Sequence, residues 1–167
     1  PLFASDISKI AVNASKKNLV KFKTKKIFLV CDAFNVKKWA KEINKIKIEK
    51  NKKIIISIWY ILHEISQNNP KRIINFFYEI KKNLPNASIL IGEITRFNHS
   101  TLSKNRSQSI MPEFLFFHEL SGQGILRYED FNYILKRIPY KIKNNISFDY
   151  IQEKNKKIPS AFIWYLI

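Results

Sequence analysis

Four side chains that could do chemistry each stand at or just after the end of an apolar run. Two are aspartates, Asp6 and Asp32, and the other two are His63 and Glu93. A carboxylate can hold an imidazole in one tautomer and make it a better base, and an acid at a strand end can bind ribose hydroxyls. In open α/β sheets, ligands bind outside the carboxyl ends of the strands. The sequence therefore predicts a ligand site built from these strand ends.

The elements that must position these residues alternate along the chain. The central one is the Ile-rich run at 53–61, which is predicted to be a strand buried on both faces and is too short to span a bilayer. Further strands are predicted at 2–5, 25–35 and 88–94, and helices at 6–19, 36–48, 69–87 and 127–138. Either Asp6 or Ser8 is expected to cap the first helix. The last residues predict two long strands joined by a turn at 153–157, an antiparallel hairpin.

Residues 95–127 interrupt this alternation. A polar segment is followed by an apolar, aromatic one that ends in glycines. An apolar insertion after a strand end, near the rim of a site, is expected to form a lid over a substrate pocket. The substrate contacts predicted in this lid are Met111, Phe114, Phe117 and His118, with Phe116 beside them and Glu113, Glu119 and Gln123 as polar candidates.

Composition limits the class of protein. The 167 residues fit one domain, and 46% hydrophobic residues can build a core. The single cysteine, Cys31, excludes a disulfide framework and fits a reducing cytosol, and no signal peptide or membrane segment is apparent. The predicted fold class is α/β, with a mostly parallel sheet, an antiparallel C-terminal hairpin and helices on both faces. No metal-ligand spacing links His63, His99 and His118.

The net charge of +17 points toward nucleic acid or an anionic membrane as a partner. However, the excess consists almost entirely of lysine, whereas bidentate phosphate contacts favour arginine. The lysines are interspersed with Asn and Ile across every segment. This distribution favours a solvated lysine-rich surface over a nucleic-acid footprint.

Together these segments resemble the class I S-adenosylmethionine-dependent methyltransferases, whose fold is Rossmann-like. The resemblance rests on "ASDISKIAVNASKKN", "CDAF", "IWYILHEIS", "SILIGEI" and "PSAFIWYLI", in that order. It implies S-adenosyl-L-methionine as cofactor. It also implies that Asp6 holds the ribose hydroxyls, that Ile7 packs on the adenine, and that Asp32 accepts from the adenine amino group. Ala33 and Phe34 would line the adenine pocket.

Within that family the chain is most similar to small-molecule O-methyltransferases. That likeness implies that His63 is the general base and that Glu93 orients it. The implied reaction is methyl transfer to a small aromatic or apolar molecule, in the cytoplasm. A second supporting glutamate of the subfamily would fall near Ile125, which cannot serve.

The family's first strand and its glycine-rich loop are not found in the sequence. The 167 residues are therefore expected to be the C-terminal part of a longer catalytic domain. The missing strand would lie between the strand that ends at Asp6 and the strand at 53–61. Its absence predicts a sheet in two pieces, of two and four strands, with poor solubility and weak cofactor binding.

Three other interpretations stay open at this point. The charge allows an RNA methyltransferase or an RNA-binding module, and the chain could also be a non-catalytic remnant of the fold. An NAD-binding fold would explain Asp6 as a ribose ligand. It does not ordinarily predict the second aspartate or the closing hairpin.

Overall fold

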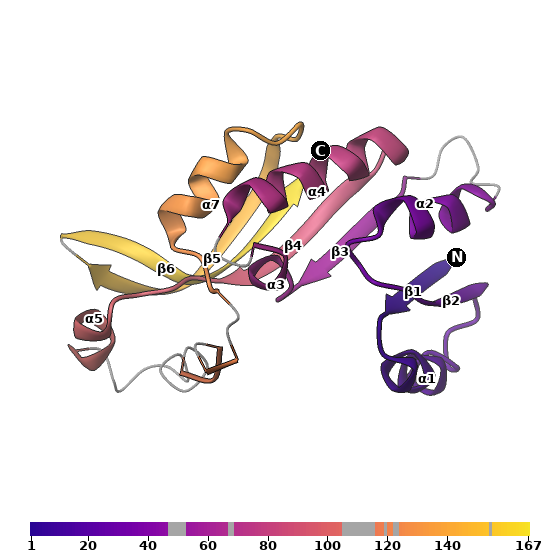
Figure 1. Ribbon diagram of the computed structural model, residues 1–167, viewed down its shortest axis with the longest axis horizontal. Helices are drawn as coiled ribbons and strands as arrows, with labels where there is room; N and C mark the ends of the chain where they lie inside the picture. The colour runs from indigo at the N-terminus through magenta and orange to yellow at the C-terminus, as the bar shows by residue number, and fades with distance from the viewer. Residues whose placement is uncertain (47–52, 67–68, 105–115, 119, 122–123, 154) are drawn as a thin grey trace. The chain divides into compact units, whose positions relative to one another are not determined.

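The computed structural model describes residues 1–46, 53–66, 69–104, 116–118, 120, 121, 124–153 and 155–167 (Figure 1). The chain forms two compact units, which are described separately below. The N-terminal unit comprises Pro1–Lys52 with Glu79–Pro85, and the C-terminal unit comprises Lys53–Tyr78 with Asn86–Ile167. The strands form one two-stranded and one four-stranded sheet, as the sequence predicted.

The N-terminal unit is built on two parallel strands, β1 (Leu2–Asp6) and β2 (Lys26–Val30). Helix α1 (Lys9–Asn18) connects them, and the Oγ of Ser8 caps it by accepting from the N–H of Ala11. Helix α2 (Val36–Asn44) follows β2 and buries the apolar face that includes Trp39 and Ile43. The sequence pattern therefore gave the correct elements, but α2 ends four residues earlier than predicted.

The C-terminal unit holds the four-stranded sheet in the order β3-β4-β6-β5. Strands β3 (Ile55–Trp59) and β4 (Ser88–Ile94) are parallel, whereas β6 (Lys156–Leu166) runs antiparallel to both β4 and β5 (Ile142–Glu153). The hairpin turn includes Asn155, whose φ of 62° lies in the left-handed region that asparagine tolerates. The predicted α/β class and the antiparallel C-terminal hairpin are confirmed.

Helices α4 (Pro70–Asn83) and α7 (Tyr128–Leu135) lie on the same side of this sheet (Figure 1). The side chains on that side are almost fully buried, and Phe162 stacks on Trp164 with ring centroids 3.9 Å apart. Tyr140 packs against Phe77 in the same core, and burial raises its pKa to about 12. This layer of helices and strands is the main apolar core of the chain.

The prediction that the strand at 53–61 is buried on both faces is wrong. Ile56 and Ile58 face the core, but Ile55 and Trp59, on the other face, are exposed. Strand β3 is an edge of the four-stranded sheet, and no described element of this unit covers its second face. The unbroken apolar run of β3 therefore indicated burial correctly for the face that carries Ile56 and Ile58, but not for the opposite face.

The segment predicted as a polar loop contains a short helix, α5 (His99–Lys104). A five-residue helix, α3 (Leu62–Ser66), directly follows β3 and carries His63. None of the described helices has an apolar stretch long enough to cross a membrane.

Candidate functional site

The N-terminal unit brings the two predicted acids to one edge of its sheet. Asp6 ends β1 and pairs with Val30, and the N–H of Cys31 donates to the carbonyl of Asp6 at 2.9 Å. Asp32 follows one residue later, and both aspartates are exposed. Because neighbouring strands lie about 5 Å apart, the two aspartates belong to the same carboxyl-end edge of this sheet.

Each carboxylate also shapes its own turn. Asp6 Oδ1 accepts from the N–H of Ser8 at 2.7 Å, and Asp32 Oδ1 accepts from the N–H of Phe34 at 2.8 Å. These bonds fix one oxygen of each acid and orient the second. A pair of oriented, exposed carboxylates can accept hydrogen bonds from hydroxyl or amino groups of a ligand.

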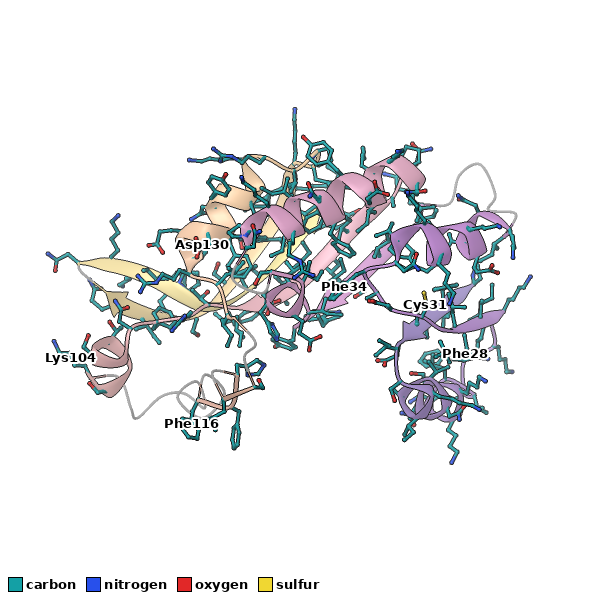
Figure 2. All side chains as sticks on the ribbon, in the orientation of Figure 1. Phe28, Cys31, Phe34, Lys104, Phe116 and Asp130 are labelled. Carbon is teal, nitrogen blue, oxygen red and sulfur yellow. The ribbon has the colours of Figure 1, made fainter. Side chains whose placement is uncertain are left out.

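The apolar residues predicted for the cofactor lie at the same edge. Ile7 and Phe34 are exposed, and Ala33 is half-buried. The Nε1–H of Trp39 donates to the carbonyl of Ala33 at 2.9 Å, which fixes the turn that carries Phe34 (Figure 2). All five residues predicted to bind the cofactor are therefore found together, with apolar side chains next to the acids.

The C-terminal unit joins His63 to Glu93, as predicted. His63 Nδ1 lies 3.2 Å from Glu93 Oε1, and the two side chains are 2% and 1% exposed. Glu93 also accepts from the backbone N–H groups of Leu62, at 2.9 Å, and Ile94, at 3.2 Å. Three groups at the ends of β3 and β4 are thus tied to one carboxylate.

These bonds determine how the imidazole can act. Glu93 serves as acceptor to two backbone N–H groups, so we assign the Nδ1 proton of His63 as the donor to the same carboxylate. Nε2 is then the nitrogen that can accept a proton. The Oγ of Ser66 donates to the carbonyls of His63 and Gly124, which holds α3 in place. An imidazole held in this way by a carboxylate is chemically able to act as a general base.

The structure describes only some of the residues predicted to form the lid. His118 is half-buried, and its ring meets that of His63 edge to face, with centroids 4.8 Å apart. Phe116 (Figure 2) and Phe117 are exposed and contact one another at 6.0 Å. Met111, Phe114, Glu113, Glu119 and Gln123 lie outside the described residues. The structure therefore places one predicted substrate contact, His118, against the candidate base.

Sequence reasoning missed the turn that aims His63. Tyr60 has a φ of 51°, which is uncommon for a residue other than glycine, and its N–H donates to the carbonyl of Gly92 at 2.9 Å. Gly92 lies directly under the indole of Trp59, so that a Cβ there would be 2.1 Å from Trp59 Cε3. The only available signal was the glycine itself, since glycine inside a strand often marks a close approach.

The described residues contain no group of three His, Cys, Asp or Glu side chains that could hold a metal ion. The candidate residues thus form two groups, one in each unit. Asp6, Ile7, Asp32, Ala33 and Phe34 belong to the N-terminal unit, and His63, Glu93 and His118 belong to the C-terminal unit.

Solved structures with the same fold are SAM-dependent methyltransferases. One from Leishmania major has a TM-score of 0.56 and 10% identity over 99% of this chain. One from Anabaena variabilis has a TM-score of 0.57 and 15% identity over 98%, and one from Methanosarcina mazei has 0.58 and 14% over 98%. No family model matches the sequence, and no curated protein matches it.

The chain therefore has the class I fold of S-adenosylmethionine-dependent methyltransferases, as the sequence motifs indicated. It spans 54% of the Leishmania protein, 66% of the Anabaena protein and 80% of the Methanosarcina protein. At these identities the likeness is one of fold. Activity has to be argued from the chain's own residues.

Proposed function

We propose that the chain is a methyltransferase domain that uses S-adenosyl-L-methionine to methylate a small aromatic or apolar molecule. The observation that carries the proposal is that Asp6 and Asp32 lie at the carboxyl ends of two adjacent parallel strands in this fold. These residues fit the cofactor, because exposed carboxylates can accept hydrogen bonds from the ribose hydroxyls and the adenine amino group. Ile7 and Phe34 supply apolar surface for the purine ring.

The bound cofactor would supply a methyl group on a positively charged sulfur, an electrophilic carbon. The residues of the chain would align the acceptor with that carbon and exclude water. For a hydroxyl acceptor, His63 Nε2 would take the hydroxyl proton as the new O–C bond forms and the carbon–sulfur bond breaks, which would leave a neutral thioether. Glu93, held by Leu62 and Ile94, would stabilise the resulting imidazolium. The exposed phenyl rings of Phe116 and Phe117 fit an aromatic or apolar acceptor.

The first test measures cofactor binding through the acids. Asp6→Ala should weaken S-adenosylmethionine binding by about 1–3 kcal/mol, because ribose hydroxyls would lose a charged acceptor. The measurement is ultraviolet crosslinking of radiolabelled S-adenosylmethionine to the full chain. The cofactor concentration is raised until crosslinking saturates, so that a weak affinity is still quantified.

Glu42→Ala provides the control. Glu42 is an acid of the same unit that pairs with Lys45 at 2.6 Å, away from the strand ends, so its loss should leave crosslinking unchanged. Unchanged affinity in both Asp6→Ala and Asp32→Ala would remove the cofactor assignment.

A further inference from the structure

In the segment from Asp6 to Asp32, the two acids lie at the ends of the segment and the lysines lie between them. Between Asp6 and Asp32 the chain carries seven lysines and no acidic residue. Six of these lysines fall within eleven residues, and together they are called the lysine ridge: Lys16, Lys17, Lys21, Lys23, Lys25 and Lys26. The expectation that lysines are evenly spread therefore fails for this segment.

The fold gathers the ridge at the amino ends of the strands. Lys16 and Lys17 lie in the last turn of α1, and Lys26 begins β2. The connecting residues lie beside the start of β1, because the N–H of Leu2 donates to the carbonyl of Lys25 at 2.8 Å. Asp6 and Asp32 lie at the carboxyl ends of the same strands.

The distance between the two ends decides whether the acids neutralise the ridge. From Leu2 to Asp6 a strand rises about 13 Å, at about 3.3 Å per residue. The Debye length at physiological salt is about 8 Å, so the carboxylates are largely screened from the ridge. The lysines, which are packed within one connection, add their potentials.

The structure of the unit explains only part of this charge. Lys16 and Lys17 favourably face the negative end of the α1 dipole. Lys21, Lys23 and Lys25 are exposed and make no ion pair with a described acid. Lys26 donates to the carbonyl of Phe22, so three lysines of the ridge carry a charge that no described acid pairs with.

Apolar side chains alternate with the cations on the ridge. Val20, which is 74% exposed, precedes Lys21, and Phe22, which is 46% exposed, lies between Lys21 and Lys23. Lys21 Nζ lies 5.6 Å from the centre of the Phe22 ring, and Lys16 Nζ lies 5.9 Å from that of Phe28 on β2 (Figure 2). Exposed rings flanked by cations can stack on unpaired bases while lysines meet phosphates.

We propose that the lysine ridge is a docking surface for single-stranded nucleic acid. It is separate from the Asp6 and Asp32 edge, so a bound strand and a bound cofactor would not compete for the same residues. A membrane fits the ridge less well, because the apolar residues are two single side chains on an irregular connection rather than one face of a helix.

The test compares two variants of equal charge. The ridge variant changes Lys21, Lys23, Lys25 and Lys26 to Gln, and the control changes four exposed lysines of the same unit, Lys37, Lys38, Lys41 and Lys45, on and just after α2. Binding of the full chain to a fluorescein-labelled twelve-nucleotide oligouridylate is followed by anisotropy at several salt concentrations. Circular dichroism confirms that both variants keep their helices.

In a plot of the logarithm of the association constant against the logarithm of the salt concentration, the slope is negative. The ridge variant should make this slope shallower by about 3, at about 0.7 per phosphate contact on single strands. The control variant should make the slope shallower by less than 1. Phe22→Ala should weaken binding about tenfold at constant salt, with an unchanged slope.

Three results would overturn the proposal. The first is an equal loss in the ridge variant and the control, which would mean that only net charge matters. The second is no binding of the oligouridylate at low salt. The third is a preference for phosphatidylserine vesicles over the oligouridylate that depends on the ridge, which would identify a membrane surface instead.

Discussion

Glu93 is the residue that holds together the candidate group of the C-terminal unit. One buried carboxylate accepts from His63 and from the backbone N–H groups of Leu62 and Ile94. The same group therefore anchors the start of α3 and fixes the orientation of the imidazole, so its structural and chemical roles cannot be separated by removing it.

His63 allows a cleaner separation. If it is the base, His63→Ala should lower methyl transfer about 100-fold while cofactor binding stays near that of the unchanged chain. The measurement is transfer of a labelled methyl group, with crosslinking of the cofactor in parallel.

Two controls support that experiment. Glu64→Ala alters the exposed neighbour of His63 and should keep its activity. Thermal unfolding reports how far the lost ring destabilises the buried site. Activity of His63→Ala within a few-fold of the unchanged chain would make His63 a spectator.

The sequence predicted these side chains because each one follows an apolar run. The contact between His63 and Glu93 was also predictable, since the ends of consecutive parallel strands are neighbours. The ring contact between His63 and His118 was not, because it depends on how a long insertion folds back. The positive φ of Tyr60 was equally hidden, as nothing in a tyrosine indicates a left-handed turn.

At the scale of elements, Trp59 and Gly92 make a close contact between β3 and β4. Trp59 pairs with Gly92, and its Nε1–H donates to Ser57 Oγ at 2.6 Å. Gly92→Ala would place a methyl group within the indole ring, so the indole must turn out toward solvent. We expect a loss of about 1–3 kcal/mol in the free energy of unfolding.

A double-mutant cycle isolates that clash. Trp59→Ala removes the indole, so Gly92→Ala in the Trp59→Ala background should cost much less than in the unchanged chain, as measured by urea unfolding. Equal costs in the two backgrounds would show that the alanine acts elsewhere.

Element boundaries were less predictable than element types. The pattern predicted strands and helices in the correct order, yet α2 is shorter than expected and α5 forms within a segment that looks like a loop. Local composition cannot indicate whether a neighbouring element covers the second face of a strand. This is why β3 was predicted to be buried on both sides.

At the scale of the molecule, the four-stranded sheet has one covered and one exposed apolar face. Exposed side chains on that second face come from the two outer strands, β3 and β5, and include Ile55, Trp59, Ile146 and Phe148. Apolar patches of this kind promote association between chains. The outer strands also offer backbone groups that can pair with another chain.

We therefore expect the 167 residues to be poorly soluble on their own. Replacing both Ile146 and Phe148 with Lys should raise the soluble concentration several-fold and lower binding of a hydrophobic dye, because charges on an edge strand oppose association. Asn145→Lys, on the opposite face of β5, adds charge at an exposed position and should help much less. A well-dispersed NMR spectrum with micromolar cofactor affinity in the unchanged chain would contradict this expectation.

The indole of Trp59 has a consequence for spectroscopy. Trp39 and Trp164 are 7% and 2% exposed, whereas Trp59 is 45% exposed. Its fluorescence should therefore lie to the red of the other two and be quenched first by acrylamide. Because Trp59 lies over Gly92 and four residues before His63, a movement of α3 or β4 would change its emission. Trp39 reports on the N-terminal unit. Excitation at the red edge of the absorption band selects the exposed indole of Trp59, so changes at the ends of β3 and β4 can be followed without an added label.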